Sequence, residues 1–200
     1  MAKTQDDARI LVAEFARIGA AHDDAVVRTV ARAAIPGSVS RVFASGTKKA
    51  IVDLLPTLDL RALAEVRDQA AYRSWFVRSL ERVSATILEL NAPDVRPGIH
   101  PGYMWGHGTK VLSLFVRDLA MHSRHFPVDV VERLAPLLYC PVDGIVIDRL
   151  RHIGVDPGVR RIREIDQDAF WSIQSLLGEA AAAAGVPRVW FDDVWSENRT

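Results

Sequence analysis

The chain has very few groups that could bind a metal cluster. It contains one cysteine, Cys140, in 200 residues. One thiol cannot form an internal disulfide or supply the several ligands of an iron–sulfur or zinc–cysteine cluster. His100, His107, His122 and His125 do not have a compact zinc-binding spacing either. We therefore expect no metal and no cofactor, and the single thiol fits a reducing cytoplasm.

Net charge and long apolar runs are also absent. Lysine plus arginine and aspartate plus glutamate each number 25, so the net charge is zero. This excludes a uniformly basic nucleic-acid-binding chain but allows a local basic face. No apolar run approaches the ~20 residues of a membrane span, and residues 1–7 lack the apolar core of a secretory signal. We expect a cytoplasmic monomer without a membrane partner.

Hydrophobic spacing with a helical period predicts an all-α fold. Hydrophobic residues make up 49% of the chain, enough for a sizeable core. The expected helices cover residues 6–21, 23–34, 48–55, 60–66, 69–90, 109–123, 127–138, 143–152, 166–184 and 187–195. The proline- and glycine-containing stretch 91–102 predicts a loop between two lobes, 1–90 and 91–200, of a single helical domain.

The segment around Lys110 carries the clearest chemical signal. Gly106 and Gly108 are separated by one residue and precede an expected helix. This pattern predicts a tight hairpin whose backbone N–H groups could bind a phosphate. Lys110 falls in the first turn of that helix, where the positive end of the helix dipole disfavours an ammonium ion. A neutral amine is the form that nucleophilic and Schiff-base chemistry requires. Helical spacing places Ser113 and Arg117 on the same stripe as Lys110.

Asp143 provides a second candidate group 33 positions later. It follows Pro141 and Val142 and precedes an expected helix, so we expect it to cap that helix. A carboxylate held by backbone N–H groups could also face a developing cation.

Together these residues resemble the helix-hairpin-helix DNA glycosylases. The resemblance rests on Gly106-His107-Gly108-Thr109-Lys110 followed by Pro141-Val142-Asp143, with a spacing similar to that of the archaeal 8-oxoguanine DNA glycosylase branch. It implies a two-lobed bundle with a helix-hairpin-helix motif and a DNA N-glycosylase with possible β-lyase activity. It further implies that Lys110 forms a Schiff base with C1′ of the deoxyribose. Asp143 would stabilise the oxocarbenium ion and help to activate the amine. The DNA-binding residues would be Gly106, His107, Gly108 and Thr109.

Two other regions could contact DNA. Trp190, Asp192 and Trp195 loosely resemble the base pocket of that branch, although core packing and helix capping are alternatives. A basic cluster could follow a DNA backbone or belong to a solvated loop. Its members are Arg149, Arg151, Arg160, Arg161 and Arg163.

Two non-enzymatic functions remain open. The chain could be a catalytically inactive helix-hairpin-helix-like module that binds DNA or a protein. This alternative predicts that Lys110 and Asp143 lie far apart or that no pocket accompanies them. The chain could also be a helical interaction protein with an accidental motif, which predicts that Gly106 to Gly108 form no hairpin.

Overall fold

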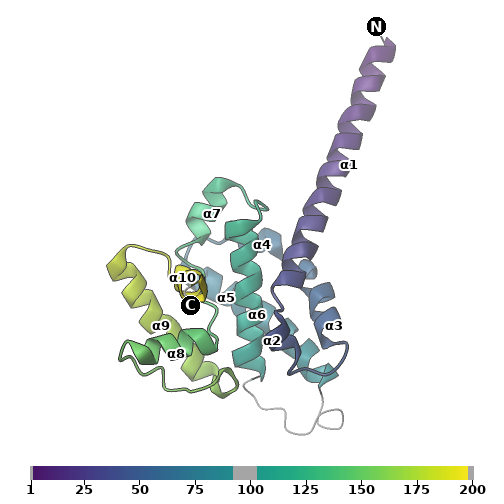
Figure 1. Ribbon diagram of the computed structural model, residues 1–200. Helices are drawn as coiled ribbons and strands as arrows, with labels where there is room; N and C mark the ends of the chain where they lie inside the picture. The colour runs from purple at the N-terminus through teal and green to yellow at the C-terminus, as the bar shows by residue number, and fades with distance from the viewer. Residues whose placement is uncertain (1, 92–102, 198–200) are drawn as a thin grey trace.

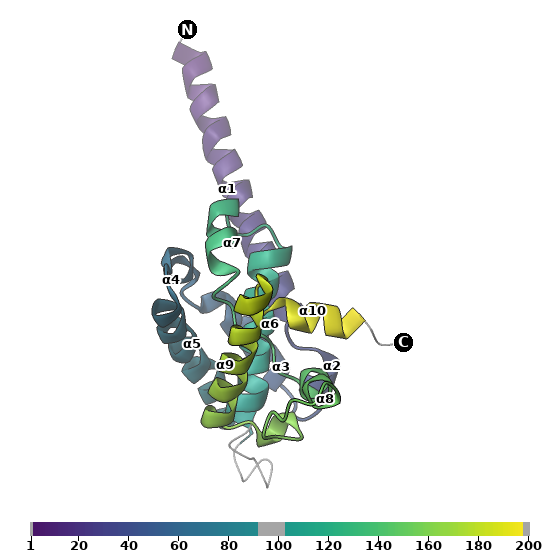
Figure 2. The same ribbon diagram turned by 90° about the vertical axis from the view of Figure 1, so that its left-hand side faces the viewer.

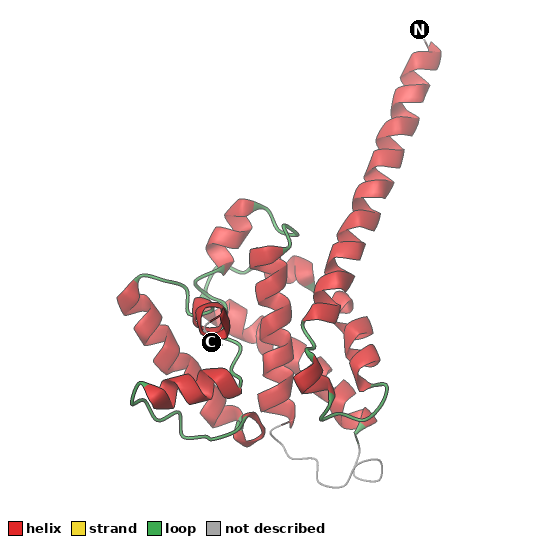
Figure 3. Cartoon of the chain, viewed as in Figure 1, coloured by secondary structure: helices red, strands yellow, loops and turns green. Residues whose placement is uncertain are grey.

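The structure is a computed structural model that describes residues 2–91 and 103–197. All regular secondary structure in these two ranges is helical (Figure 3), which confirms the all-α prediction. The α-helices are α1 (Ala2–Ala33), α2 (Gly37–Ser40), α3 (Thr47–Leu54), α4 (Leu60–Glu65), α5 (Gln69–Leu90), α6 (Thr109–Arg117), α7 (Val128–Leu134), α8 (Gly144–His152), α9 (Gln167–Ala184) and α10 (Trp190–Glu197). Shorter 3₁₀ segments are η1 (Leu55–Thr57) and η4 (Ile162–Glu164), and π-helical segments are η2 (Tyr103–Gly108) and η3 (Asp118–His122).

Aspartates cap several of these helices. The carboxylates of Asp59, Asp68 and Asp166 each accept a hydrogen bond from the backbone N–H three residues later, at 2.8–2.9 Å. These bonds satisfy donors that a helix N-terminus leaves without an intrahelical partner. The loop 91–102, which divides the two expected lobes, lies outside the described residues apart from Asn91.

Helix α6 runs through the middle of the body, between α8, α9 and α10 on one side and α1, α2 and α3 on the other (Figure 1). One connected hydrophobic cluster reaches from Val27 in α1 to Val189 just before α10. An aromatic group lies within it. Tyr139 contacts Phe76 of α5 and Phe170 of α9 at ring-centroid distances of 4.9 and 5.8 Å. The core therefore joins both halves of the sequence around α6.

Helix α1 differs from the two separate helices expected over 6–21 and 23–34. It is continuous, and its N-terminal half projects from the body (Figures 1 and 2). Ala20, Ala21 and Ala25 surround the expected break, and alanine has the highest helix propensity. Asp23 and Asp24 are exposed to water, so they can lie within the helix rather than begin a new one. In the ranges 2–91 and 103–197, no helix has the length and apolar character needed to cross a membrane.

Candidate active site

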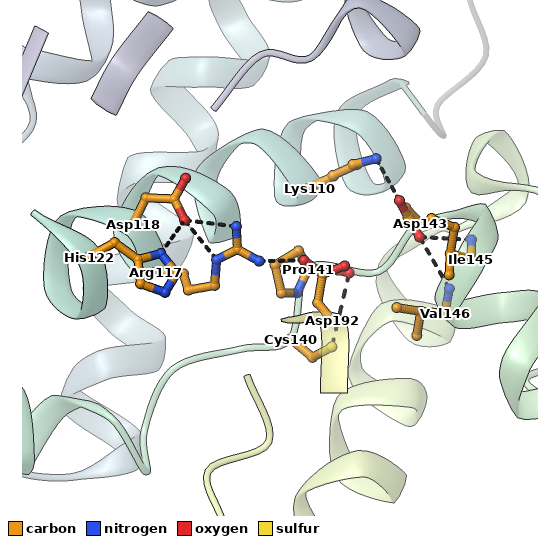
Figure 4. A network of polar contacts seen from close by, with 10 residues as sticks. All are labelled: Lys110, Arg117, Asp118, His122, Cys140, Pro141, Asp143, Ile145, Val146 and Asp192. Atoms are coloured by element: carbon orange, nitrogen blue, oxygen red, sulfur yellow. Dashed lines mark hydrogen bonds and ion pairs between the residues drawn. The ribbon is translucent and has the colours of Figure 1, made fainter. Parts of the chain in front are cut away.

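Lys110 and Asp143 meet in the folded chain. Lys110 lies in the first turn of α6, and Asp143 immediately precedes α8. The Nζ atom of Lys110 donates a hydrogen bond to Oδ2 of Asp143 at 2.8 Å (Figure 4). The two side chains retain only 10% and 13% of their exposure. An ion pair between residues 33 positions apart is therefore held in a largely buried environment.

The Asp143 carboxylate has a second set of partners. Its Oδ1 atom accepts hydrogen bonds from the backbone N–H groups of Ile145 at 2.8 Å and Val146 at 3.1 Å. Asp143 is thus the N-cap of α8, as its position in the sequence predicts. One carboxylate oxygen faces the helix N-terminus and the other faces Lys110, so the cap also fixes the direction of the ion pair.

The backbone leading to Asp143 is held by two buried side chains that the sequence analysis did not identify. Gln174 of α9 accepts a hydrogen bond from the N–H of Cys140 at 3.0 Å and donates one to its carbonyl at 2.7 Å. Arg188 donates Nε to the carbonyl of Leu138 at 3.0 Å. These contacts satisfy backbone groups of a segment without regular structure. No local sequence signal marks either residue, because their partners lie 34 and 50 positions away.

A second polar group lies two turns along α6. Arg117 forms ion pairs with Asp118 at 2.7 Å and with Asp192 of α10 at 2.5 Å (Figure 4). Nδ1 of His122 lies 3.3 Å from Asp118. Lys110 and Arg117 are seven residues apart, so they lie on one face of α6, as expected from helical spacing. This face is connected to α8 through Asp143 and to α10 through Asp192.

Cys140 interacts electrostatically with Asp192, Asp143 and Arg117, but its thiol is chemically unreactive. Its side chain is fully buried, and Sγ lies 4.0 Å from the carbonyl oxygen of Pro141. Burial, and next the negative charge of Asp192, raise the pKa of the thiol well above its ordinary value. The thiol therefore stays protonated near neutral pH and is a poor nucleophile.

The expected base-pocket residues are placed as follows. Asp192 is buried and bound to Arg117, whereas Trp190 is 44% exposed on the surface. The side chain of Trp195 lies outside the described residues. The ion pair between Asp192 and Arg117 is a contact that the sequence did not predict.

The expectation of an exposed hairpin at Gly106–Gly108 is wrong. These residues belong to the π-helical η2, and Gly108 has helical backbone angles, φ −63° and ψ −46°, where the chain enters α6. Residues 106–109 are all buried. The ring of His107 packs edge-on against Phe43 at 5.7 Å, and the Thr109 hydroxyl donates to the carbonyl of Gly106 at 3.2 Å.

Close packing explains the glycine at position 106. A Cβ atom added there would lie 1.9 Å from the carbonyl oxygen of Ile162 in η4. Glycine allows the backbone of η2 to approach the backbone of η4, which a side chain would prevent. The requirement at this position is therefore space rather than a turn.

The arginine cluster lies beside surface hollows. Arg151 and Arg160 line a hollow of about 340 Å³ between the end of α8 and the following loop. Arg149 lines a smaller one of about 310 Å³ with Asp148 and His152. Two further hollows lie beside α9 and beside α1, and Lys110 and Asp143 line none of these four.

The described residues contain no group of three or more histidine, cysteine, aspartate or glutamate side chains arranged to hold a metal ion. The chemistry available at Lys110 and Asp143 is that of an amine and a carboxylate.

Comparisons of the chain with protein-family models, with curated proteins and with solved structures found no match.

Proposed function

We propose that this protein is a DNA N-glycosylase with associated β-lyase activity, in which Lys110 is the nucleophile and Asp143 is its charged partner. The observation that carries the proposal is the 2.8 Å contact between Nζ of Lys110 and Oδ2 of Asp143. The resemblance to the helix-hairpin-helix glycosylases requires such a pair at the starts of two helices.

The chemistry uses each group in turn. Asp143 accepts a proton from the Lys110 ammonium group, and the resulting amine attacks C1′ of the deoxyribose. As the glycosidic bond breaks, its electron pair leaves with the base, which takes up the proton held by Asp143, and the sugar ring opens to form an imine with Lys110. The Asp143 carboxylate, regenerated by that proton transfer, stabilises the positive charge on C1′ and on the protonated imine. β-Elimination then removes a proton from C2′ to water and breaks the C3′–O bond, whose electron pair leaves with the phosphate. Water finally hydrolyses the imine and regenerates the lysine.

Positively charged side chains other than Lys110 would bind the DNA. Arg151 and Arg160 provide guanidinium groups beside a hollow in the loop that follows α8, and arginine binds phosphate oxygens well. Because the net charge is zero, affinity depends on a few such contacts rather than on the whole molecule.

Borohydride trapping tests the proposal. The protein is incubated with a duplex containing an abasic site and with one containing 8-oxoguanine, and sodium borohydride reduces the imine to a stable adduct. We expect an adduct with the wild type and none with Lys110→Gln, because only a primary amine forms the imine. Lys49→Gln is the matched control, since Lys49 is an exposed lysine and its variant should retain the adduct.

Asp143→Asn provides the second arm. Asparagine caps a helix about as well as aspartate, so α8 should survive while base excision slows by orders of magnitude. An adduct that persists in Lys110→Gln, or a wild type that forms none, would refute the assignment of Lys110.

A second candidate function is a helical interaction module with a structural ion pair. The buried, helical Gly106–Gly108 segment favours it, because that segment lacks the exposed hairpin expected of a DNA-binding motif. Duplex binding, measured by fluorescence anisotropy across a salt series, separates the possibilities when no adduct forms. Salt-dependent binding would indicate an inactive DNA-binding module, and absence of binding would indicate an interaction protein.

A further inference from the structure

We propose that the projecting half of α1 pairs with α1 of a second copy of this chain, so that the protein is a homodimer. This proposal replaces the expectation of a monomer and is independent of the proposed enzymatic function. Residues 10–25 of α1 are all exposed, and the N-terminal part of the helix stands away from the body in both views (Figures 1 and 2).

The projecting helix has an apolar face. Leu11, Phe15 and Ile18 are 58%, 70% and 49% exposed. At ~100° per residue, their directions fall within about 60° of one another, so they form one stripe. Ile10 and Val12 are also largely exposed, but they point about 100° to either side of Leu11 and lie outside the stripe. Large apolar side chains gathered in this way indicate an interaction surface rather than isolated exposed residues.

The stripe continues onto the body. His22, Ala25 and Thr29 extend the alternating spacing of four and three residues that begins at Leu11 and is typical of helices that pair along a seam. These three residues line a hollow of about 450 Å³, together with His122 and Ser123 at the end of η3. A second helix lying along the stripe would therefore find a recess at its lower end.

The chain's own core cannot cover the stripe. Val27, Val30 and Ala31 anchor the C-terminal half of α1 in the core. Their directions are centred roughly 150° away from the stripe, given ~100° per residue. Because α1 is one continuous helix, the stripe cannot turn toward the body while these residues remain buried. A helical segment of this length is only marginally stable alone in water, so pairing would also stabilise it.

Area and charge favour a second copy as the occupant. Leu11, Phe15 and Ile18 present roughly 350 Å² per copy, so two copies bring about 700 Å² of apolar area together. His22, Ala25 and Thr29 lengthen this seam toward the ~1,200 Å² at which specific interfaces begin. The sequence of α1 contains five acidic and five basic residues. A membrane-surface helix instead has a polar face rich in lysine and arginine. A helix without net charge is compatible with its own copy.

Sedimentation equilibrium of the full chain over a range of concentrations tests the proposal. We expect twice the chain mass of 22.2 kDa for the wild type. The double variant Phe15→Gln/Ile18→Gln should weaken dimerisation by roughly a hundred-fold or more, because it removes two apolar anchors from each copy. Glutamine has good helix propensity, so circular dichroism can verify that the body remains folded.

The matched control is Val128→Gln/Ile153→Gln. Both side chains are exposed apolar residues elsewhere on the surface, and this variant should dimerise like the wild type. A wild type that stays monomeric up to about 100 µM would overturn the proposal. So would a dimer that the α1 variant leaves unchanged, or a monomer that instead co-sediments with vesicles of phosphatidylcholine and phosphatidylglycerol.

Discussion

Lys110→Met and Asp143→Asn, made singly and together, measure the coupling within the buried ion pair. Lys110→Met keeps much of the side-chain stem and leaves the Asp143 carboxylate with its two backbone partners. We expect it to lower the free energy of unfolding by about 2–3 kcal/mol, less than the 3–5 kcal/mol typical of an orphaned buried charge. Asp143→Asn retains the cap but leaves an ammonium group on a residue that is 8% exposed, which should cost about 2–4 kcal/mol.

The double variant removes both charges, so its loss should be smaller than the sum of the single losses. The expected coupling free energy is about 2 kcal/mol. Urea denaturation followed by circular dichroism at 222 nm gives the free energy of unfolding for all four proteins.

The Lys49–Asp53 pair offers a matched control cycle. Its nitrogen–oxygen distance is 2.7 Å, close to the 2.8 Å of Lys110–Asp143, but its side chains are 84% and 53% exposed. Water screens such a pair, and we expect a coupling much smaller than that of the buried pair. If the two cycles gave equal couplings, burial would not strengthen the Lys110–Asp143 interaction, and the argument from its environment would be wrong.

Two further changes test other parts of the structure. Gly106→Ala should lower the free energy of unfolding by about 1–3 kcal/mol, because its Cβ would meet the carbonyl oxygen of Ile162. Gly144→Ala is the control: a Cβ there has no atom within 4 Å, so this variant should not be destabilised. Urea denaturation of both variants checks the prediction. Burial lowers the pKa of His125, an effect that Asp23 partly opposes, so the unfolded chain binds more protons and stability should fall as the pH drops below about 6.5. His125→Asn should make this fall shallower in denaturation measured between about pH 5 and pH 7, and equal slopes would contradict the assignment.

Features that depend on neighbouring residues could be read from the sequence. The spacing of apolar residues predicts helix 69–90, which the structure shows as α5, Gln69–Leu90. Asp143 before α8 and Lys110 in the first turn of α6 also follow from local patterns. Helix propensity, capping and periodicity involve residues within about one or two turns, so one sequence contains the necessary information.

Gly106 and α1 show where local patterns were insufficient. A glycine pair before a helix is compatible with a hairpin and with close helix packing, and the carbonyl of Ile162, 56 residues later, decided between them. The periodicity of α1 predicts an apolar face but not whether the chain's own core covers it. That outcome depends on the direction in which Val27 and Val30 anchor the helix.

The sequence alone thus determined the helical class, the starts of α5 and α6, and the residue types of the candidate site. Only the tertiary structure brought Lys110 within 2.8 Å of Asp143 and held the intervening backbone through Gln174 and Arg188. The physical reason is range. Backbone preferences and caps act between near neighbours, whereas the position of an ion pair across 33 residues depends on how the whole core packs around α6.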